Sequence, residues 1–391
     1  MKSAPSPVEK RLLPFDGMRG IAALGVVAFH MNPASPLLFW AWTFVDMFFV
    51  LSGFLIGSIL YRGFSEGTLS LKNFWIRRVL RIWPLYYLTL IIILLVHLFA
   101  STDGVPLKEV VRSLFFVQFT GGYLHPGANW EGMINHFIPS FGHSWSIATE
   151  EQFYLLLPAV LWLIGVKSRS IFLFVLTAIA LSEFLLYADF VPGLLLTRLQ
   201  GLGLGLMLVP LSQWLNNPAT SVRPSQRTAA LSVVILGLVV GLFIMLPIFM
   251  QIAPALWHGE TINPDLGRTF VHASILGMAL VYFGIAGLIL AFPKGAVARV
   301  LSTPVLVYLG SISYAVYMFH VPVEGLFVSV RGQALSTETW MVQTGYWITI
   351  LVLAHVSKIL IENRLNALKS RYPVYIRSTP PFSPRSDTVI S

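Results

Sequence analysis

The chain alternates between long apolar stretches and short polar segments. A helix that crosses a membrane needs about 20 mostly apolar residues, and ten stretches reach or approach that length. The pattern therefore predicts an all-α fold, a polytopic transmembrane helical bundle of about ten spans. The predicted spans are residues 13–31, 38–60, 82–100, 152–166, 170–188, 193–211, 229–250, 270–292, 303–323 and 340–361.

The composition agrees with a membrane protein. Of the 391 residues, 56% are hydrophobic and only 11% are charged, whereas about 25% of the residues in a soluble domain are charged. The chain has no cysteine, which excludes disulfides, thiol catalysis and cysteine-ligated metals. A cleavable signal peptide is not expected, because Asp16 and Arg19 interrupt the first apolar run and no small-residue cleavage site follows.

The basic residues predict the orientation. If the N-terminus is cytoplasmic, 20 of the 26 Lys and Arg residues fall in inside segments, four in outside segments and two within spans. This bias follows the positive-inside rule, so both termini are expected in the cytoplasm. The net charge of +9 is then a topology signal, and no nucleic-acid partner is expected. Residues 366–391 have a disordered composition, which divides the chain into a membrane domain, 1–365, and a cytoplasmic tail, 366–391.

The first span carries three ionisable residues, Asp16, Arg19 and His30. On an ideal helix, Arg19 and His30 point within about 20° of each other and lie about 16 Å apart along the axis, and Asp16 falls within about 40° of His30. Ionisable groups inside a membrane are costly, so this shared face is a candidate functional site. An imidazole there can act as a general base. A helix-packing histidine is the simpler alternative, but three polar groups on one face favour function.

Two arginines mark the cytoplasmic end of the third span. Arg78 and Arg81 are three residues apart and therefore share a helix face. Two guanidinium groups can bind the phosphates of a cytosolic ligand through charge-assisted hydrogen bonds. Membrane topology and anionic lipid headgroups select the same residues, so the sequence leaves both interpretations open.

The segment that leads into the fourth span contains two adjacent carboxylates, Glu150 and Glu151, shortly after Trp145 and Ser146. Acidic residues in a first turn stabilise a helix N-terminus, and Ser146 followed by Glu150 resembles a loose capping arrangement. That explanation accounts for one acid. A second acid close to Trp145 and Tyr154 also fits a sugar-binding surface, so an acceptor site is the alternative interpretation.

Polar residues also interrupt the ninth span. Tyr314 and His320 could line a cavity, or they could belong to an interfacial aromatic belt and to interhelical hydrogen bonds. The longest connection contains His125, His136 and His143. These three lack a compact ligand spacing, so no metal site is expected.

Taken together, the motifs resemble the integral-membrane acyltransferase-3 family of bacterial O-acyltransferases. The resemblance runs from about residue 12 to about residue 365. Three departures are Phe15, Thr149 and Arg364, where the family commonly has Leu, Val and Pro. The motifs that carry the resemblance are Asp16-Gly17-Met18-Arg19-Gly20 with His30, Asp46-Met47-Phe48-Phe49-Val50-Leu51-Ser52-Gly53-Phe54, Arg78 and Arg81 followed by Pro84 and Tyr86, Trp145-Ser146 with Glu150-Glu151-Gln152-Phe153-Tyr154, and Ile312-Ser313-Tyr314 with Tyr317, His320 and Pro322.

The resemblance implies transfer of an acyl group, expected to be acetyl, from cytoplasmic acyl-CoA to a hydroxyl of a cell-surface or exported glycan. The protein would reside in the cytoplasmic (inner) membrane and bind acyl-CoA as a co-substrate, with no permanently bound cofactor. His30 would be a general base or an acyl relay, and Asp46 is a better candidate than Asp16 for orienting it. The remaining assignments are Glu150 and Glu151 to catalysis, Arg19, Arg78 and Arg81 to CoA binding, and Trp145, Ser146, Tyr154, Tyr314 and His320 to acceptor binding.

Two alternatives stay open at this point. One keeps the enzyme but gives it a small-molecule acceptor, such as a macrolide sugar. The other is a secondary transporter that uses Arg19 and His30 as a coupling site, although no inverted repeat is evident by eye. The acyl chain length, the route of the acyl group across the membrane, the depth of His30 and the oligomeric state are not determined by the sequence.

Overall fold

The computed structural model of the protein describes residues 12–100, 105–118, 138, 140–188, 190, 194–216, 224–260 and 263–376. This part of the chain is built from helices and contains no strand beyond a single isolated bridge between Leu69 and Tyr375. The predicted all-α helical bundle is therefore confirmed.

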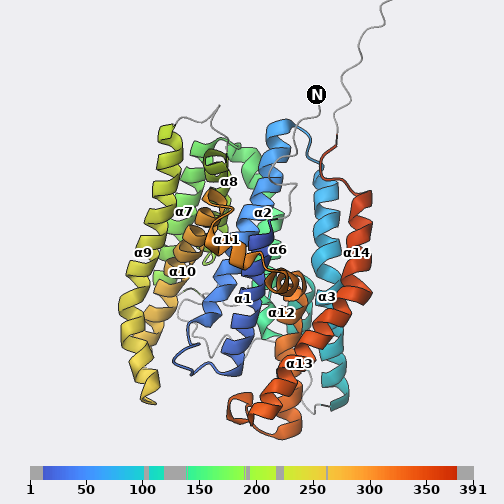
Figure 1. Ribbon diagram of the computed structural model, residues 1–391. Coiled ribbons are helices and arrows are strands. Elements are labelled where there is room, and N and C mark those ends of the chain that lie inside the picture. The colour runs from blue at the N-terminus through green and yellow to red at the C-terminus, as the bar shows by residue number, and fades with distance from the viewer. Residues whose placement is uncertain are drawn as a thin grey trace, which may run out of the picture.

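The helices follow one another along the chain as Figure 1 shows. A π-helical turn, Lys358–Glu362, joins α13 to α14. Short 3₁₀ turns occur at Ala41–Thr43, Gly142–Ser144, Leu335–Thr337 and Lys369–Arg371. The α-helices are α1 (Leu13–Met31), α2 (Phe44–Glu66), α3 (Leu71–Ala100), α4 (Leu107–Leu114), α6 (Trp145–Ile164), α7 (Ser168–Tyr187), α8 (Leu199–Asn216), α9 (Pro224–Trp257), α10 (Pro264–Ala291), α11 (Ala296–Leu301), α12 (Pro304–Arg331), α13 (Trp340–Ser357) and α14 (Asn363–Leu368).

Each of the ten predicted spans corresponds to a helix. Within the described ranges, eight helical stretches are long and apolar enough to cross a membrane. The other two predicted spans are α1, which contains Asp16, Arg19 and His30, and α8, whose apolar stretch covers only Leu199–Leu215. In Figure 1, α9 lies at one edge of the bundle and α3, α13 and α14 at the other, with α1 and α2 between them.

Glycines bring the central helices into backbone contact. A Cβ atom added to Gly310 of α12 would lie 1.8 Å from the carbonyl oxygen of Asp16 in α1, and one added to Gly205 of α8 would lie 2.1 Å from that of Val50 in α2. Small residues at helix interfaces allow such close approach in membrane bundles. The two contacts hold the polar face of α1 against α12, and α2 against α8.

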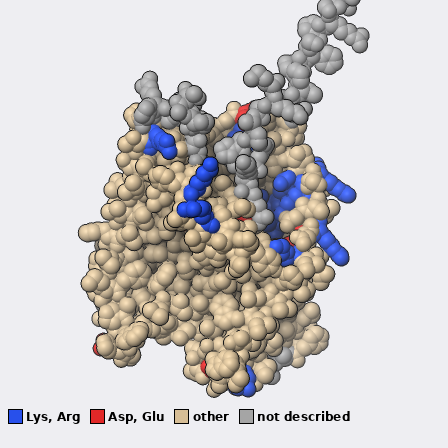
Figure 2. Space-filling model, viewed as in Figure 1, with Lys and Arg blue, Asp and Glu red and all other residues tan. Residues whose placement is uncertain are grey.

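The C-terminal end of the described chain returns to the loop between α2 and α3. The Ser70 amide donates to the Val374 carbonyl, and the Ile376 amide donates to the Thr68 carbonyl, both at 2.8 Å. Figure 2 shows Lys and Arg gathered mainly in the half of the molecule that contains this loop, with one small patch near the opposite end. The expected boundary at residue 365 falls inside α14, and residues 377–391 of the expected tail lie outside the described residues.

Candidate active site

A cavity of about 300 Å³ lies between α1, α2, α3, α6 and α12. We call it the central cavity. Seven of the twelve site residues predicted from the sequence line it, although they come from four different helices. Its polar lining consists of Asp16, Arg19, Ser52, Ser58, Arg78, Arg81, Ser146, Glu150, Tyr154, Ser313, Tyr314 and Tyr317.

One part of the central cavity is strongly cationic. Arg19 of α1 joins Arg78 and Arg81 of α3 in its lining, and among the described lining residues only Asp16 and Glu150 are carboxylates. None of the three arginines forms an ion pair with a carboxylate in the described part of the chain. Unneutralised guanidinium groups in a concave site are suited to bind phosphate groups.

The acidic pair of α6 is divided between two environments. Glu150 lines the cavity and accepts hydrogen bonds from the Ser52 hydroxyl at 2.6 Å and from the Tyr154 hydroxyl at 2.9 Å. Glu151 accepts a bond from the Trp83 indole at 3.0 Å and is not part of the cavity wall. Successive residues of an α-helix point about 100° apart, and here the two carboxylates face different neighbours.

Three histidines from distant parts of the sequence form a cluster beside the central cavity. The ring centroids of His30 and His320 are 4.8 Å apart, and those of His143 and His320 are 5.0 Å apart. His143 and His320 are buried, whereas His30 is partly exposed. His30 is therefore the most accessible of the three imidazoles.

Backbone carbonyls fix the tautomer of each ring. A carbonyl oxygen only accepts a hydrogen bond, so the ring nitrogen that contacts it carries the hydrogen, and in a neutral imidazole the other nitrogen keeps its lone pair. The buried lone-pair atoms, His143 Nδ1 and His320 Nε2, have no hydrogen-bond partner in the described structure. The three bonds run from His30 Nδ1 to Val26 at 2.9 Å, from His143 Nε2 to Met318 at 3.2 Å and from His320 Nδ1 to Tyr317 at 2.6 Å.

Tyr317 connects the histidine cluster to the central cavity. Its hydroxyl donates to the His143 carbonyl at 2.8 Å and lies 2.6 Å from the Ser146 hydroxyl. Its ring centroid is 5.3 Å from that of His320. Because Tyr317 and Ser146 also line the cavity, it borders the histidine cluster at these two side chains, while His30, His143 and His320 are not part of its lining.

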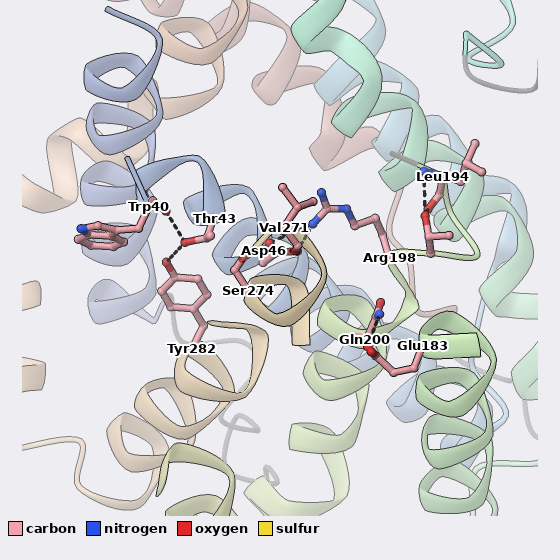
Figure 3. Close-up of polar contacts among 11 residues, drawn as sticks. Trp40, Thr43, Asp46, Glu183, Leu194, Arg198, Gln200, Val271, Ser274 and Tyr282 are labelled. Carbon is pink, nitrogen blue, oxygen red and sulfur yellow. Dashed lines mark hydrogen bonds and ion pairs between the residues drawn. The ribbon is translucent and has the colours of Figure 1, made fainter. Parts of the chain in front are cut away.

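Asp46 takes part in a separate buried ion pair. Both of its carboxylate oxygens accept hydrogen bonds from Arg198, at 3.0 and 3.2 Å, as Figure 3 shows. The Arg198 guanidinium also lies over the rings of Trp42, at 5.3 Å, and Trp145, at 5.0 Å. Trp145 thus packs on Arg198 and is not part of the cavity wall.

A second, larger cavity adjoins the central one. It has a volume of about 630 Å³ and shares Asp16, Arg19 and Arg81 with the central cavity. We call it the mouth cavity. Its other polar lining residues come from α12, from the π-helical turn and from the segment after it, namely Tyr308, Ser311, Lys358, Glu362, Asn363, Asn366 and Lys369.

Sequence patterns do not identify several of these residues. In the sequence, Arg198 is only one of two basic residues within predicted spans, and the lysines of the mouth cavity are only topology signals. His143 belongs to a group of three histidines without a metal-ligand spacing, and the other two, His125 and His136, lie outside the described residues. The direct proximity of His143 to the Trp145-Ser146 motif was the available signal. Among the described side chains, no group of three or more His, Asp or Glu residues is arranged to hold a metal ion.

The fold and these cavities define an integral-membrane protein with a polar site buried between its helices. The model of the acyltransferase-3 family, described as an acyltransferase domain, matches residues 13–357. The chain belongs to this family of acyltransferases, which confirms the predicted resemblance and the predicted enzyme class.

Curated relatives carry O-acetyltransferase names. A Staphylococcus aureus (strain COL) protein described provisionally as an O-acetyltransferase is 29% identical over 331 residues, covering 78% of this chain and 49% of that protein. The peptidoglycan O-acetyltransferase OatA of Listeria monocytogenes is 28% identical, with 84% of this chain and 52% of that protein covered. The O-acetyltransferase OatA of Staphylococcus aureus (strain NCTC 8325) is 27% identical, with 83% and 53% covered. The chain spans about half the length of these relatives. No solved structure matches it.

Proposed function

We propose that the protein transfers an acetyl group from cytoplasmic acetyl-CoA to a hydroxyl of a glycan beyond the cytoplasmic membrane. The observation that carries this proposal is the central cavity, which has three unneutralised arginines in its lining and borders the histidine cluster at Tyr317. The relatives named as O-acetyltransferases, one of them for peptidoglycan, support the acetyl group and the glycan. The secondary-transporter alternative is not retained, because the chain belongs to an acyltransferase family.

The arginines mark the donor end. Arg19, Arg78 and Arg81 would bind phosphates of the donor, while its pantetheine arm extends through the central cavity toward His30. Arg19 and His30 are about 16 Å apart along α1, a distance suited to an extended arm. The positive-inside rule supports a cytoplasmic position for the arginine end.

His30 would act as the base. Its Nδ1 hydrogen is bound to the Val26 carbonyl, which leaves the Nε2 lone pair to take the proton of the acceptor hydroxyl. The hydroxyl oxygen attacks the thioester carbonyl carbon, the carbon–sulfur bond breaks, and the imidazolium returns the proton to the departing thiolate. In the acyl-relay alternative, the same nitrogen attacks the thioester carbonyl carbon first, the carbon–sulfur bond breaks and the CoA thiolate leaves. The hydroxyl oxygen then attacks the acetyl carbon, the carbon–nitrogen bond breaks, and the freed imidazole takes the hydroxyl proton.

His320 and His143 would form the acceptor side. Their lone-pair nitrogens are buried and need hydrogen-bond donors, and the hydroxyl groups of a sugar are donors. Ser146 and Tyr317 supply further polar atoms between this cluster and the cavity.

The two carboxylates of α6 and Asp46 would play different parts. Glu150 is the better candidate for a direct role, because it lines the cavity together with Tyr154 and Tyr314. Glu151 would act through Trp83 on α3. Asp46 would position Trp145 through Arg198 rather than orient His30 itself.

The test is acceptor-dependent release of CoA thiol by the full-length protein in proteoliposomes. We expect release with acetyl-CoA and soluble peptidoglycan fragments, and mass spectrometry should find acetyl groups on the sugar hydroxyls. Acetylation of a macrolide sugar but not of the fragments would replace the glycan with a small-molecule acceptor. No acetyl transfer to either class would overturn the proposal.

A further inference from the structure

The mouth cavity has the size and charge of a binding site, and the proposed chemistry gives it no role. It is about twice as large as the central cavity, at about 630 Å³ against about 300 Å³. Ligand pockets for drug-sized molecules range from about 300 to 1,000 Å³. The mouth cavity can therefore hold a group much larger than a single phosphate.

The charge of its lining favours an anion. Four cations face it, Arg19, Arg81, Lys358 and Lys369, against the carboxylates of Asp16 and Glu362. The two lysines are held by short-range contacts within this region. Lys358 donates to the Ser311 hydroxyl and lies 4.5 Å from the centre of the Tyr308 ring, and Lys369 donates to the Asn366 side chain.

The local backbone places the charged residues of the C-terminal helices in the lining of the mouth cavity. The helix that begins as α13 changes to a π-helical turn at Lys358–Glu362 and then continues as α14. π-helical turns within α-helices are frequent at functional sites. Lys358 and Glu362 of this turn both line the mouth cavity. Beyond it, the Arg77 guanidinium donates to the carbonyls of Lys369, at 3.0 Å, and Tyr372, at 3.3 Å, which holds the segment with Lys369 against α3.

The boundary with the central cavity points to the ligand. Arg19 and Arg81 line both cavities, so the two cavities meet at these side chains, and a ligand bound by both arginines would place an anionic part in the mouth and a slender part in the centre. Acyl-CoA has this form, because a 3′-phosphorylated adenosine diphosphate is joined to the pantetheine arm. A lipid headgroup offers the same phosphate chemistry, but its binding would not explain why the same two arginines line both cavities.

We infer that the mouth cavity binds the nucleotide of acyl-CoA, with Lys358 and Lys369 at the 3′-phosphate and Arg19 and Arg81 at the diphosphate. This inference rests on the proposed function, since it requires acyl-CoA as the donor. It adds that the enzyme distinguishes CoA from its 3′-dephosphorylated form.

The experiment compares acetyl-CoA with acetyl-3′-dephospho-CoA. Dissociation constants are measured by calorimetry on the full-length protein in phosphatidylcholine nanodiscs, for the wild type and for Lys358→Met and Lys369→Met. We expect the wild type to bind acetyl-CoA about tenfold more tightly than the dephosphorylated analogue, because the lost contacts are charge-assisted. Each variant should lose most of this preference while its affinity for acetyl-3′-dephospho-CoA stays unchanged, which also shows that the variant is folded. Lys294→Met, at an exposed lysine outside both cavities, should behave as the wild type.

Four results would overturn the inference. If the wild type binds the two nucleotides with equal affinity, or if the variants lose affinity for both equally, the lysines do not bind the 3′-phosphate. Acetyl-CoA would still be the donor. If neither nucleotide binds, acetyl-CoA is not the donor, and the proposed function is also wrong. In nanodiscs that contain phosphatidylglycerol, a lysine-dependent rise in the unfolding temperature without nucleotide discrimination would assign the cavity to a lipid headgroup.

Discussion

The imidazole rings of His30 and His320 lie edge to face, with their centroids 4.8 Å apart, although 290 positions separate them in the chain. This contact depends on the close packing of α1 against α12, where Gly310 lies directly on the Asp16 backbone. The same packing places Arg19 and Tyr314 in one cavity lining. The histidine cluster and the central cavity are thus both products of one helix interface.

Replacing His30 with alanine should remove the proposed base. We expect kcat for acetyl transfer to fall by about 10²- to 10⁴-fold, the usual contribution of general acid–base catalysis, with little change in the affinity for acetyl-CoA. The rate of CoA thiol release and the calorimetric dissociation constant measure the two quantities separately.

His97→Ala is the matched control for this substitution. His97 on α3 donates through Nδ1 to the carbonyl four residues earlier, Ile93, at 3.0 Å, as His30 does with Val26. Unlike His30, it is not part of the histidine cluster beside the central cavity, so its loss should leave kcat unchanged. A His30→Ala protein with wild-type turnover would exclude His30 as base and as acyl relay.

The sequence predicted the helices and many of the cavity residues for a physical reason. Spans are recognised from local hydropathy, and polar residues within spans stand out because they are costly in a membrane. Arg19 and Glu150 are of this kind. The partner of Asp46 could not be found in the same way, because Arg198 is 152 positions away and only the packing of α2 on α8 brings them together.

The remaining site residues could not be recognised from the sequence, because basic residues at the membrane surface have more than one explanation. Lys358 and Lys369 look like the basic residues that any cytoplasmic helix end contains, and only the three-dimensional fold places them in one cavity lining with Arg19. The separation of Glu150 from Glu151 follows from helix geometry, but the direction of each depends on the neighbours of α6. Local patterns therefore predict which residues are unusual, and tertiary packing decides which of them meet.

The buried pair of Asp46 and Arg198 should be strongly coupled. Asp46→Asn or Arg198→Met alone leaves one buried charge without its counterion, which costs about 3–5 kcal/mol. The double substitution should cost less than the sum of the two single ones. Thermal unfolding in detergent measures all three, with Glu66→Gln as the exposed control, because its pair with Arg62 is solvent-accessible and contributes about 0.5 kcal/mol or less. Strictly additive effects would mean that the ion pair contributes no coupling.

The two neighbouring carboxylates of α6 should differ in function. Glu150→Gln removes a negative charge from a cavity lined by three arginines and weakens the charge-assisted bonds from Ser52 and Tyr154. Because Glu150 holds these two hydroxyls at the cavity, and misplacement of groups at an active site can lower a rate by about 10²-fold, we expect kcat for acetyl transfer to fall by at least about tenfold. Glu151→Gln should change it by less than about threefold, because this side chain contacts Trp83 outside the cavity. Equal effects of the two substitutions would contradict the division of roles.

The contact between α1 and α12 should tolerate no side chain at Gly310. Gly310→Ala would place a methyl group 1.8 Å from the Asp16 carbonyl oxygen, a backbone atom that cannot move aside without shifting α1. Overpacking of this kind costs about 1–3 kcal/mol, and a shift of α1 would also separate His30 from His320. We therefore expect a lower unfolding temperature together with a loss of acetyl transfer. Gly345→Ala on α13 is the control, because no atom lies within 4 Å of the added Cβ, and it should keep full activity and wild-type or slightly higher stability. Normal activity of Gly310→Ala would show that the histidine cluster does not depend on this helix contact.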